Sequence, residues 1–102
     1  MKIIIIYKPF PEGMHGIIAG GVQPIKKGYM ILIDCELSAE EQAFTLRHEF
    51  AHIMLNHCDT GTGVFGEGWE QREKEADDYA DKMTDSLLDA LLSLSEVIHE
   101  EK

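Results

Sequence analysis

The chain has 102 residues, of which 44% are hydrophobic and 27% are charged, and its formal net charge is −10. This length and balance predict one globular domain over residues 1–102 and exclude a disordered chain. The negative charge disfavours direct contact with nucleic acid, which requires clustered Lys and Arg. Two cysteines are too few for a disulfide scaffold, and no apolar run suits a signal peptide or a membrane span, so we expect a cytoplasmic protein.

The first third of the chain predicts a small antiparallel or mixed sheet of about three strands. The β-branched run 3–7 stops before Pro9 and is typical of a buried strand. Residues 22–27 contain Pro24 and predict an edge strand or a loop. The aliphatic run 29–34 is the clearest strand of the three.

Three helices are expected to follow the sheet. Residues 38–57 begin with Ser38 and Glu41 in the spacing of a capping box, and their apolar residues lie on more than one face, so this helix should be largely buried. Residues 60–68 hold four glycines and predict either a mobile segment over a site or a plain connector. The second helix, about 69–83, is acidic, and the third, from 85 or 86 to 100, carries a leucine stripe typical of core packing.

The first predicted helix contains the motif His-Glu-Phe-Ala-His at residues 48–52. Residues four apart on a helix point the same way, so His48 and His52 can bind one metal ion. Glu49 lies one step round the helix, where it can deprotonate a metal-bound water as in a zinc peptidase. The alternative is a chance match on a helix surface. Inside a buried helix, however, these polar groups need partners, and Zn²⁺ would satisfy all of them at once.

A catalytic zinc takes three protein ligands, so a third ligand is expected downstream. Glu73, Ala76, Asp77 and Ala80 fall on one face of the second helix, and the two alanines allow that face to approach the first helix. We therefore predict Glu73 as the third ligand and Asp77 as the acceptor for the outer N–H of a ligand histidine. Three neighbouring carboxylates remain alternatives for the ligand: Glu70, Glu75 and Asp78.

Five further side chains have chemistry that could serve the motif. His57 suits a favourable cation at a helix C-terminus, and Cys58 suits a packed thiol. His15, Tyr29 and Tyr79 are each able to donate a hydrogen bond to a developing oxyanion, and the sequence does not select among them.

Two segments together resemble the ImmA/IrrE family of metallo-endopeptidases. Residues 43–57, AFTLRHEFAHIMLNH, are similar to its FTLAHELGH-like helix, and residues 73–80, EKEADDYA, to its ExEAN-x-FA-like segment, with Asp77 where Asn is common. The resemblance to this family covers roughly residues 29–83. It implies a minimal zincin-like α+β domain with the sheet packed on three helices, and the first Glu of the second segment, Glu73, as a gluzincin-type zinc ligand.

The resemblance also implies an activity and a partner. Members are cytoplasmic zinc-dependent proteases, often carried by mobile elements, that act on repressor or regulator proteins. Many continue into a Leu-Met-Pro segment where this chain has Lys82-Met83-Thr84-Asp85. The leading hypothesis is therefore a zinc endopeptidase that cuts a regulator protein. The second hypothesis is a metal-containing binding module that sequesters a regulatory protein without cutting it. The third is a metal-free interaction protein that uses the leucine stripe. The oligomeric state is left open.

Overall fold

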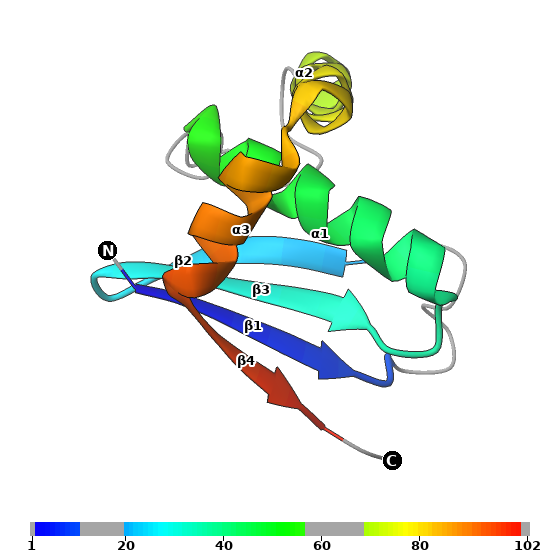
Figure 1. Cartoon of the computed structure of the whole chain (residues 1–102), viewed down its shortest axis with the longest axis vertical. Coiled ribbons are helices and arrows are strands. Elements are labelled where there is room, and N and C mark those ends of the chain that lie inside the picture. Colours follow the sequence, from blue (N-terminus) through cyan, green and yellow to red (C-terminus); the bar gives the residue numbers. More distant parts are fainter. Residues whose placement is uncertain (1, 11–19, 57–68, 101–102) are drawn as a thin grey trace.

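The computed structural model describes residues 2–10, 20–56 and 69–100 (Figure 1). The elements in chain order are β1 (Lys2–Lys8), β2 (Gly20–Ile25), β3 (Gly28–Asp34), α1 (Ala39–Met54), α2 (Trp69–Lys82), α3 (Asp85–Ser93) and β4 (Ser95–His99). The strands form a sheet in the order β2-β3-β1-β4, and the helices lie on one side of it. This arrangement confirms the predicted α+β class.

The sheet is mixed. β1 pairs in parallel with both β3 and β4, whereas β2 runs antiparallel to β3 at one edge. Pro24, which has no N–H to donate, is tolerated in this edge strand, as the sequence predicted. Alternate side chains of the two central strands are fully buried against the helices: Ile3, Ile5, Ile31 and Ile33 from the sheet pack with Leu46 and Phe50 of α1 and Leu91 of α3.

The prediction of a single third helix to residue 100 is wrong, and the sheet has a fourth strand. α3 ends at Ser93, and β4 then pairs with β1. Two hydroxyls promote this ending, because Ser93 Oγ donates to the carbonyl of Ala90 and Ser95 Oγ to that of Leu91. The β-branched residues Val97 and Ile98 suit the strand, which pairs with an edge of β1 that would otherwise be unpaired.

α1 is anchored at its beginning and pressed onto β2. The predicted capping box is confirmed: Ser38 Oγ accepts the amide of Glu41 at 3.1 Å, and the Glu41 carboxylate accepts the amide of Ser38 at 3.4 Å. A Cβ on Gly20 would lie 2.7 Å from Thr45 Cγ2, so glycine allows α1 to approach the strand closely. α1 ends at Met54, and Asn56 follows with a left-handed φ of 62°.

Several sequence predictions fall outside the described residues. These concern the glycine-rich loop 60–68 and the side chains His15, His57 and Cys58. Within the described ranges, none of the helices combines the length and the apolar character that crossing a membrane requires.

Candidate metal centre

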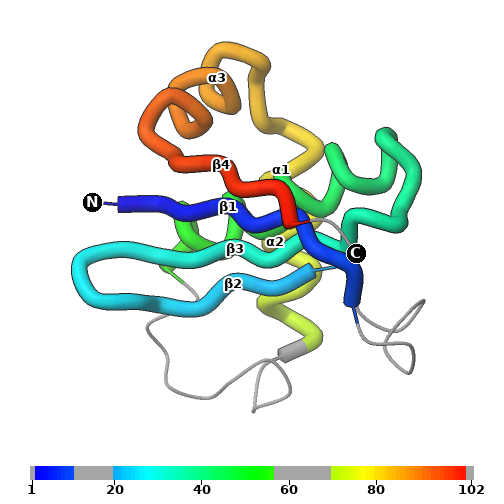
Figure 2. The backbone as a smooth tube through the Cα atoms, turned by 90° about the horizontal axis from the view of Figure 1, so that it is seen from below, coloured from blue at the N-terminus to red at the C-terminus, as the bar shows by residue number. Residues whose placement is uncertain are grey.

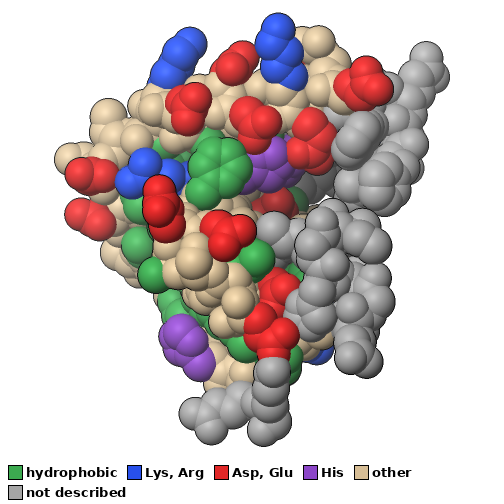
Figure 3. Space-filling model, turned by 90° about the vertical axis from the view of Figure 1, so that its right-hand side faces the viewer, with side chains coloured by type: hydrophobic (Ala, Val, Ile, Leu, Met, Phe, Trp, Pro, Cys, Tyr) green, Lys and Arg blue, Asp and Glu red, His purple; other side chains and the backbone are tan. Residues whose placement is uncertain are grey.

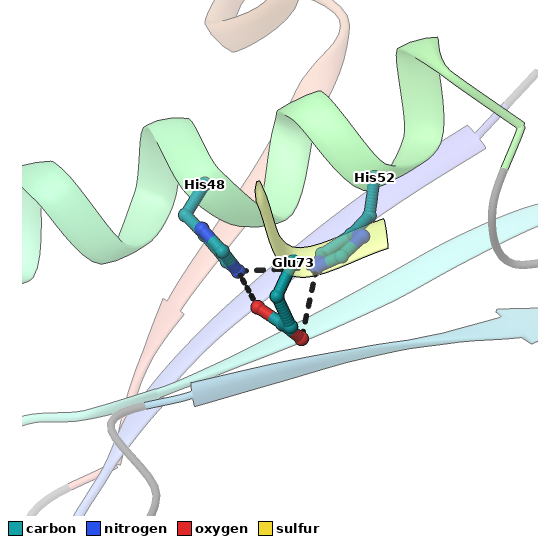
Figure 4. Close-up of side chains that lie close together, drawn as sticks. All are labelled: His48, His52 and Glu73. Atoms are coloured by element: carbon teal, nitrogen blue, oxygen red, sulfur yellow. Dashed lines mark hydrogen bonds and ion pairs between the residues drawn. The ribbon is translucent and has the colours of Figure 1, made fainter. Parts of the chain in front are cut away.

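α1 presents His48 and His52 on one face, toward α2 (Figure 4). The two imidazole rings are 4.7 Å apart between centroids and nearly perpendicular, and their Nε2 atoms are 3.1 Å apart. Both rings are shielded from solvent, since their side chains are only 14% and 11% exposed. The i,i+4 spacing thus brings the two nitrogen donors to one point beneath the helix.

α2 supplies a carboxylate to the same point. One oxygen of Glu73 lies 2.6 Å from Nε2 of His48, and the other lies 3.5 Å from Nε2 of His52. In tetrahedral zinc sites with bonds of about 2.0–2.1 Å, the donor atoms are separated by about 3.3 Å. The separations of 3.1 and 3.5 Å are close to this value, whereas the 2.6 Å between His48 and Glu73 is shorter. His48, His52 and Glu73 form the group that could hold a metal among the residues of known placement.

The buried face of α2 explains why Glu73 reaches the histidines. Ala76 and Ala80 are 0% and 2% exposed, and α2 packs on α1. Small side chains on this face let the two helices approach, as the sequence predicted. Glu70, Glu75 and Asp78 are exposed on α2 and do not join the group.

Asp77 contacts one of the histidines. Its carboxylate lies 2.8 Å from Nδ1 of His48, on the opposite side of the ring from Glu73. A neutral imidazole carries one N–H, so donating from Nδ1 to Asp77 leaves the Nε2 lone pair directed at the group of donors. This is the position that the sequence predicted for Asp77.

Glu49 is buried beside this group, with 5% of its surface exposed. Burial raises the pKa of the Glu49 carboxyl to about 7; the nearby His48 lowers that pKa, and the Glu73 carboxylate raises it. A carboxyl with a pKa near neutral pH can accept and release a proton during a reaction.

Of the three suggested oxyanion donors, two fall within the described ranges. Tyr29 and Tyr79 are partly buried against the hydrophobic core, and neither belongs to the group of metal donors. Sequence reasoning missed Phe44, which is 50% exposed and whose ring centroid lies 6.3 Å from that of His48. Phe44 lies four residues before His48, and this i,i+4 spacing, which also aligns the two histidines, was the sequence signal for the contact.

The surface around the centre is acidic. Figure 3 shows carboxylates around a histidine that has a hydrophobic side chain beside it. On α2 the exposed acidic residues are Glu70, Glu75, Asp77, Asp78 and Asp81. A cation bound at the centre would offset part of this negative charge.

Comparison with known proteins supports the interpretation of the motifs. The Peptidase_M78 family model, described as the IrrE N-terminal-like domain, matches residues 1–84, which include both helices of the centre. Searches of curated proteins and of solved structures give no significant match. The matched region covers most of the chain and carries both the HExxH motif and the Glu73 segment, so the chain belongs to the IrrE N-terminal-like family of metallopeptidase domains.

Proposed function

We propose that the protein is a zinc-dependent endopeptidase that cuts a protein substrate. The observation that carries this proposal is the convergence of three donors, from His48, His52 and Glu73, next to a buried carboxyl with a raised pKa. A purely structural zinc site has no use for such a carboxyl and usually completes its coordination with protein groups. A repressor or regulator protein in the cytoplasm is the substrate we propose, on the family resemblance.

Each residue of the centre has a distinct task in this proposal. Zn²⁺ held by the three ligands would polarise the scissile carbonyl and lower the pKa of a bound water. Glu49 takes a proton from the attacking water and gives it to the leaving amine. Asp77 holds His48 in the tautomer that directs Nε2 inward.

β2 is the element we propose to align the substrate. β3 lies between β2 and β1, so it has no unpaired edge to offer a peptide. β2 is at the sheet edge next to α1. Pro24 lacks an N–H, so it must occupy a position whose backbone polar groups point away from β3. This direction alternates along a strand, so Val22, two residues earlier, also points its backbone N–H and C=O away from β3, toward the open edge. An extended peptide can add to this edge by main-chain hydrogen bonds.

Metal content is the first test. Wild-type protein, Glu73→Ala and the control Glu75→Ala are purified without chelator, supplied with zinc, and measured by elemental analysis. We expect one zinc per chain in the wild type and in Glu75→Ala, and loss of zinc in Glu73→Ala, because Glu75 lies outside the donor group. Equal zinc in all three proteins would contradict the proposed ligand set.

Cleavage is tested separately with Glu49→Gln. Wild type and variant are incubated with a mixed library of fluorescence-quenched peptides and with candidate regulator proteins. We expect the variant to keep its zinc and to lose turnover by a factor of a hundred or more, as removal of a general base requires. Zinc without any cleavage in the wild type would instead favour the second hypothesis, a binding module that sequesters its partner.

A further inference from the structure

Phe44 is a large apolar side chain that the fold leaves exposed beside the metal centre. It is 50% exposed, and its ring plane is inclined by 30° to that of His48, whose centroid lies 6.3 Å away. Phe44 belongs neither to the hydrophobic core nor to the partly buried residues packed on it. Its ring therefore contributes little to the fold, and a ligand that covers the ring would gain from removing it from water.

The other large hydrophobic side chains that are exposed in the described ranges point elsewhere. Leu94, Val97 and Ile98 lie in β4 or directly before it, at the opposite edge of the sheet from β2 (Figure 2). Met54 follows His52 by two residues, so it points to the opposite side of α1. Single exposed apolar side chains are ordinary on a protein surface. Of these five, however, Phe44 is the one that is aromatic and neighbours a metal ligand.

α2 places carboxylates at the same level as Phe44. Glu73 contacts both histidines of the motif, and Asp77, one turn later, contacts the first of them, His48. Advancing along α2 therefore means moving back along α1. One more turn brings Asp81 to the level of Phe44, which precedes His48 by one turn. Asp77 is 55% exposed and Asp81 is also exposed, so both carboxylates are open to a ligand that covers Phe44.

The charge on this side of the centre is negative even with a metal in place. α2 contains six acidic and three basic residues and so carries a charge of −3. A bound Zn²⁺ would reduce that charge to −1 without neutralising it. The net charge of −10 on the whole chain also attracts a basic segment over a longer distance. A ligand that suits this surface therefore combines apolar area with positive charge.

We propose, on the basis of the peptidase function proposed above, that Phe44 selects substrates with Lys or Arg near the scissile bond. The apolar stem of such a side chain packs on the exposed ring, and its cationic head lies over the ring or reaches the carboxylates of α2. A carboxylate has several acceptor positions, so Asp77 can accept a hydrogen bond from the substrate while it holds His48. An uncharged substrate side chain would gain nothing from these carboxylates, and an acidic one would be repelled.

Cleavage of a peptide library tests this selection. Zinc-loaded wild type, Phe44→Ala and the control Met54→Ala are given fluorescence-quenched peptides in which each position in turn holds Lys, Arg or norleucine, an uncharged analogue of Lys. We expect the wild type to cut within two residues of Lys or Arg. In Phe44→Ala the preference for Lys over norleucine should fall at least threefold, through KM rather than kcat.

Met54→Ala also truncates an exposed side chain of α1, and it should behave as the wild type. All three proteins should hold the same amount of zinc, because neither residue belongs to the donor group. A wild type that cuts without regard to Lys or Arg would overturn the proposal. So would a Phe44→Ala variant that keeps the full preference.

The carboxylate at the level of Phe44 has a matched control on the same helix. Asp78 is exposed like Asp81 but is turned about 100° from Asp77 around α2. Asp81→Asn should lower the preference for Lys and Arg about threefold at low salt and less at high salt, whereas Asp78→Asn should change it little. Equal effects of the two substitutions would contradict a carboxylate positioned beside the ring.

A binding measurement separates this selection from the peptidase function. The Lys and norleucine pools of the library, labelled with fluorescein, are titrated into zinc-loaded Glu49→Gln, and binding is followed by fluorescence anisotropy. We expect the Lys pool to bind at least threefold more tightly, and this difference to disappear when Phe44→Ala is added. That result without cleavage by the wild type would reject the endopeptidase and retain the role of Phe44. Equal binding of the two pools, or binding of neither, would overturn that role whether or not the wild type cleaves.

Discussion

Glu49 is held where its negative charge is unfavourable in the folded protein. Burial is the main reason that its pKa rises from 4.5 to about 7, and the Glu73 carboxylate adds to the rise. Below pH 4.5 the carboxyl is protonated in both folded and unfolded chains and has no effect on stability. Between pH 4.5 and 7 the folded state binds more protons than the unfolded state, so the free energy of unfolding falls as pH rises.

We therefore predict that Glu49→Gln stabilises the metal-free protein, but only above pH 4.5. The difference in unfolding free energy between variant and wild type should grow up to about pH 7, to about 3 kcal/mol at most, and then stay constant. Urea unfolding in the presence of a chelator, repeated across this pH range, measures the difference. Parallel pH profiles for the two proteins would show that the Glu49 carboxyl is not desolvated in the fold.

Helical periodicity explains how far the centre could be predicted from the sequence. The spacings His48–His52 and Glu73–Asp77 are local, and each places its two side chains on one face of a helix. The alanines beside Glu73 further indicated which face of α2 would meet α1. The burial of Glu49 depends on the whole surrounding fold, and no local pattern gave its extent.

At the level of elements, the contact between α1 and β2 brings the metal centre next to the proposed substrate edge. A Cβ added to Gly20 would lie 2.6 Å from the backbone oxygen of Leu32 and 2.7 Å from Thr45 Cγ2. A backbone oxygen in a sheet cannot move aside easily, so the helix or the strand would have to shift. A Cβ on the neighbouring Gly21 would meet nothing within 4 Å.

Gly20→Ala should therefore destabilise the protein by about 1–3 kcal/mol, whereas Gly21→Ala should change stability by less than about 1 kcal/mol. Both substitutions add one methyl group to the same strand, so they differ only in what that group meets. Urea unfolding of the two variants measures the effect. Similar losses in both would mean that α1 does not press on β2 at Gly20.

The elements predicted correctly are those with a local signal. Ser38 and Glu41 determine where α1 begins, and the aliphatic runs determine β1 and β3. Residues 95–99 continue a helical pattern of apolar residues, and that pattern predicted a helix through them. Their strand conformation depends on pairing with β1, nearly the whole chain away, and on the hydroxyls of Ser93 and Ser95. The local spacing of apolar residues carries no information about pairing with so distant a strand.

At the scale of the whole molecule, α2 is the helix that a bound metal would stabilise most. It packs on α1 and makes no comparable contact with the sheet, whereas α1 and α3 both touch strands. Its own composition is polar apart from Trp69, the two buried alanines and the partly buried Tyr79. A metal held by His48, His52 and Glu73 would tie α2 to α1 at a point where few apolar contacts hold it.

Zinc should consequently protect α2 more than the sheet. A ligand at about 1,000 times its dissociation constant stabilises the state that binds it by about 4 kcal/mol, and local opening of α2 breaks the site. Hydrogen exchange measured with zinc and with chelator should show faster exchange across α2 after metal removal and little change in β1 and β3, which form the buried centre of the sheet. In Glu73→Ala, zinc should leave the exchange of α2 unchanged, because one of the three donors is missing. Equal protection of every element by zinc would mean that α2 opens only when the whole domain unfolds, and its link to the core would then be stronger than its helix contacts indicate.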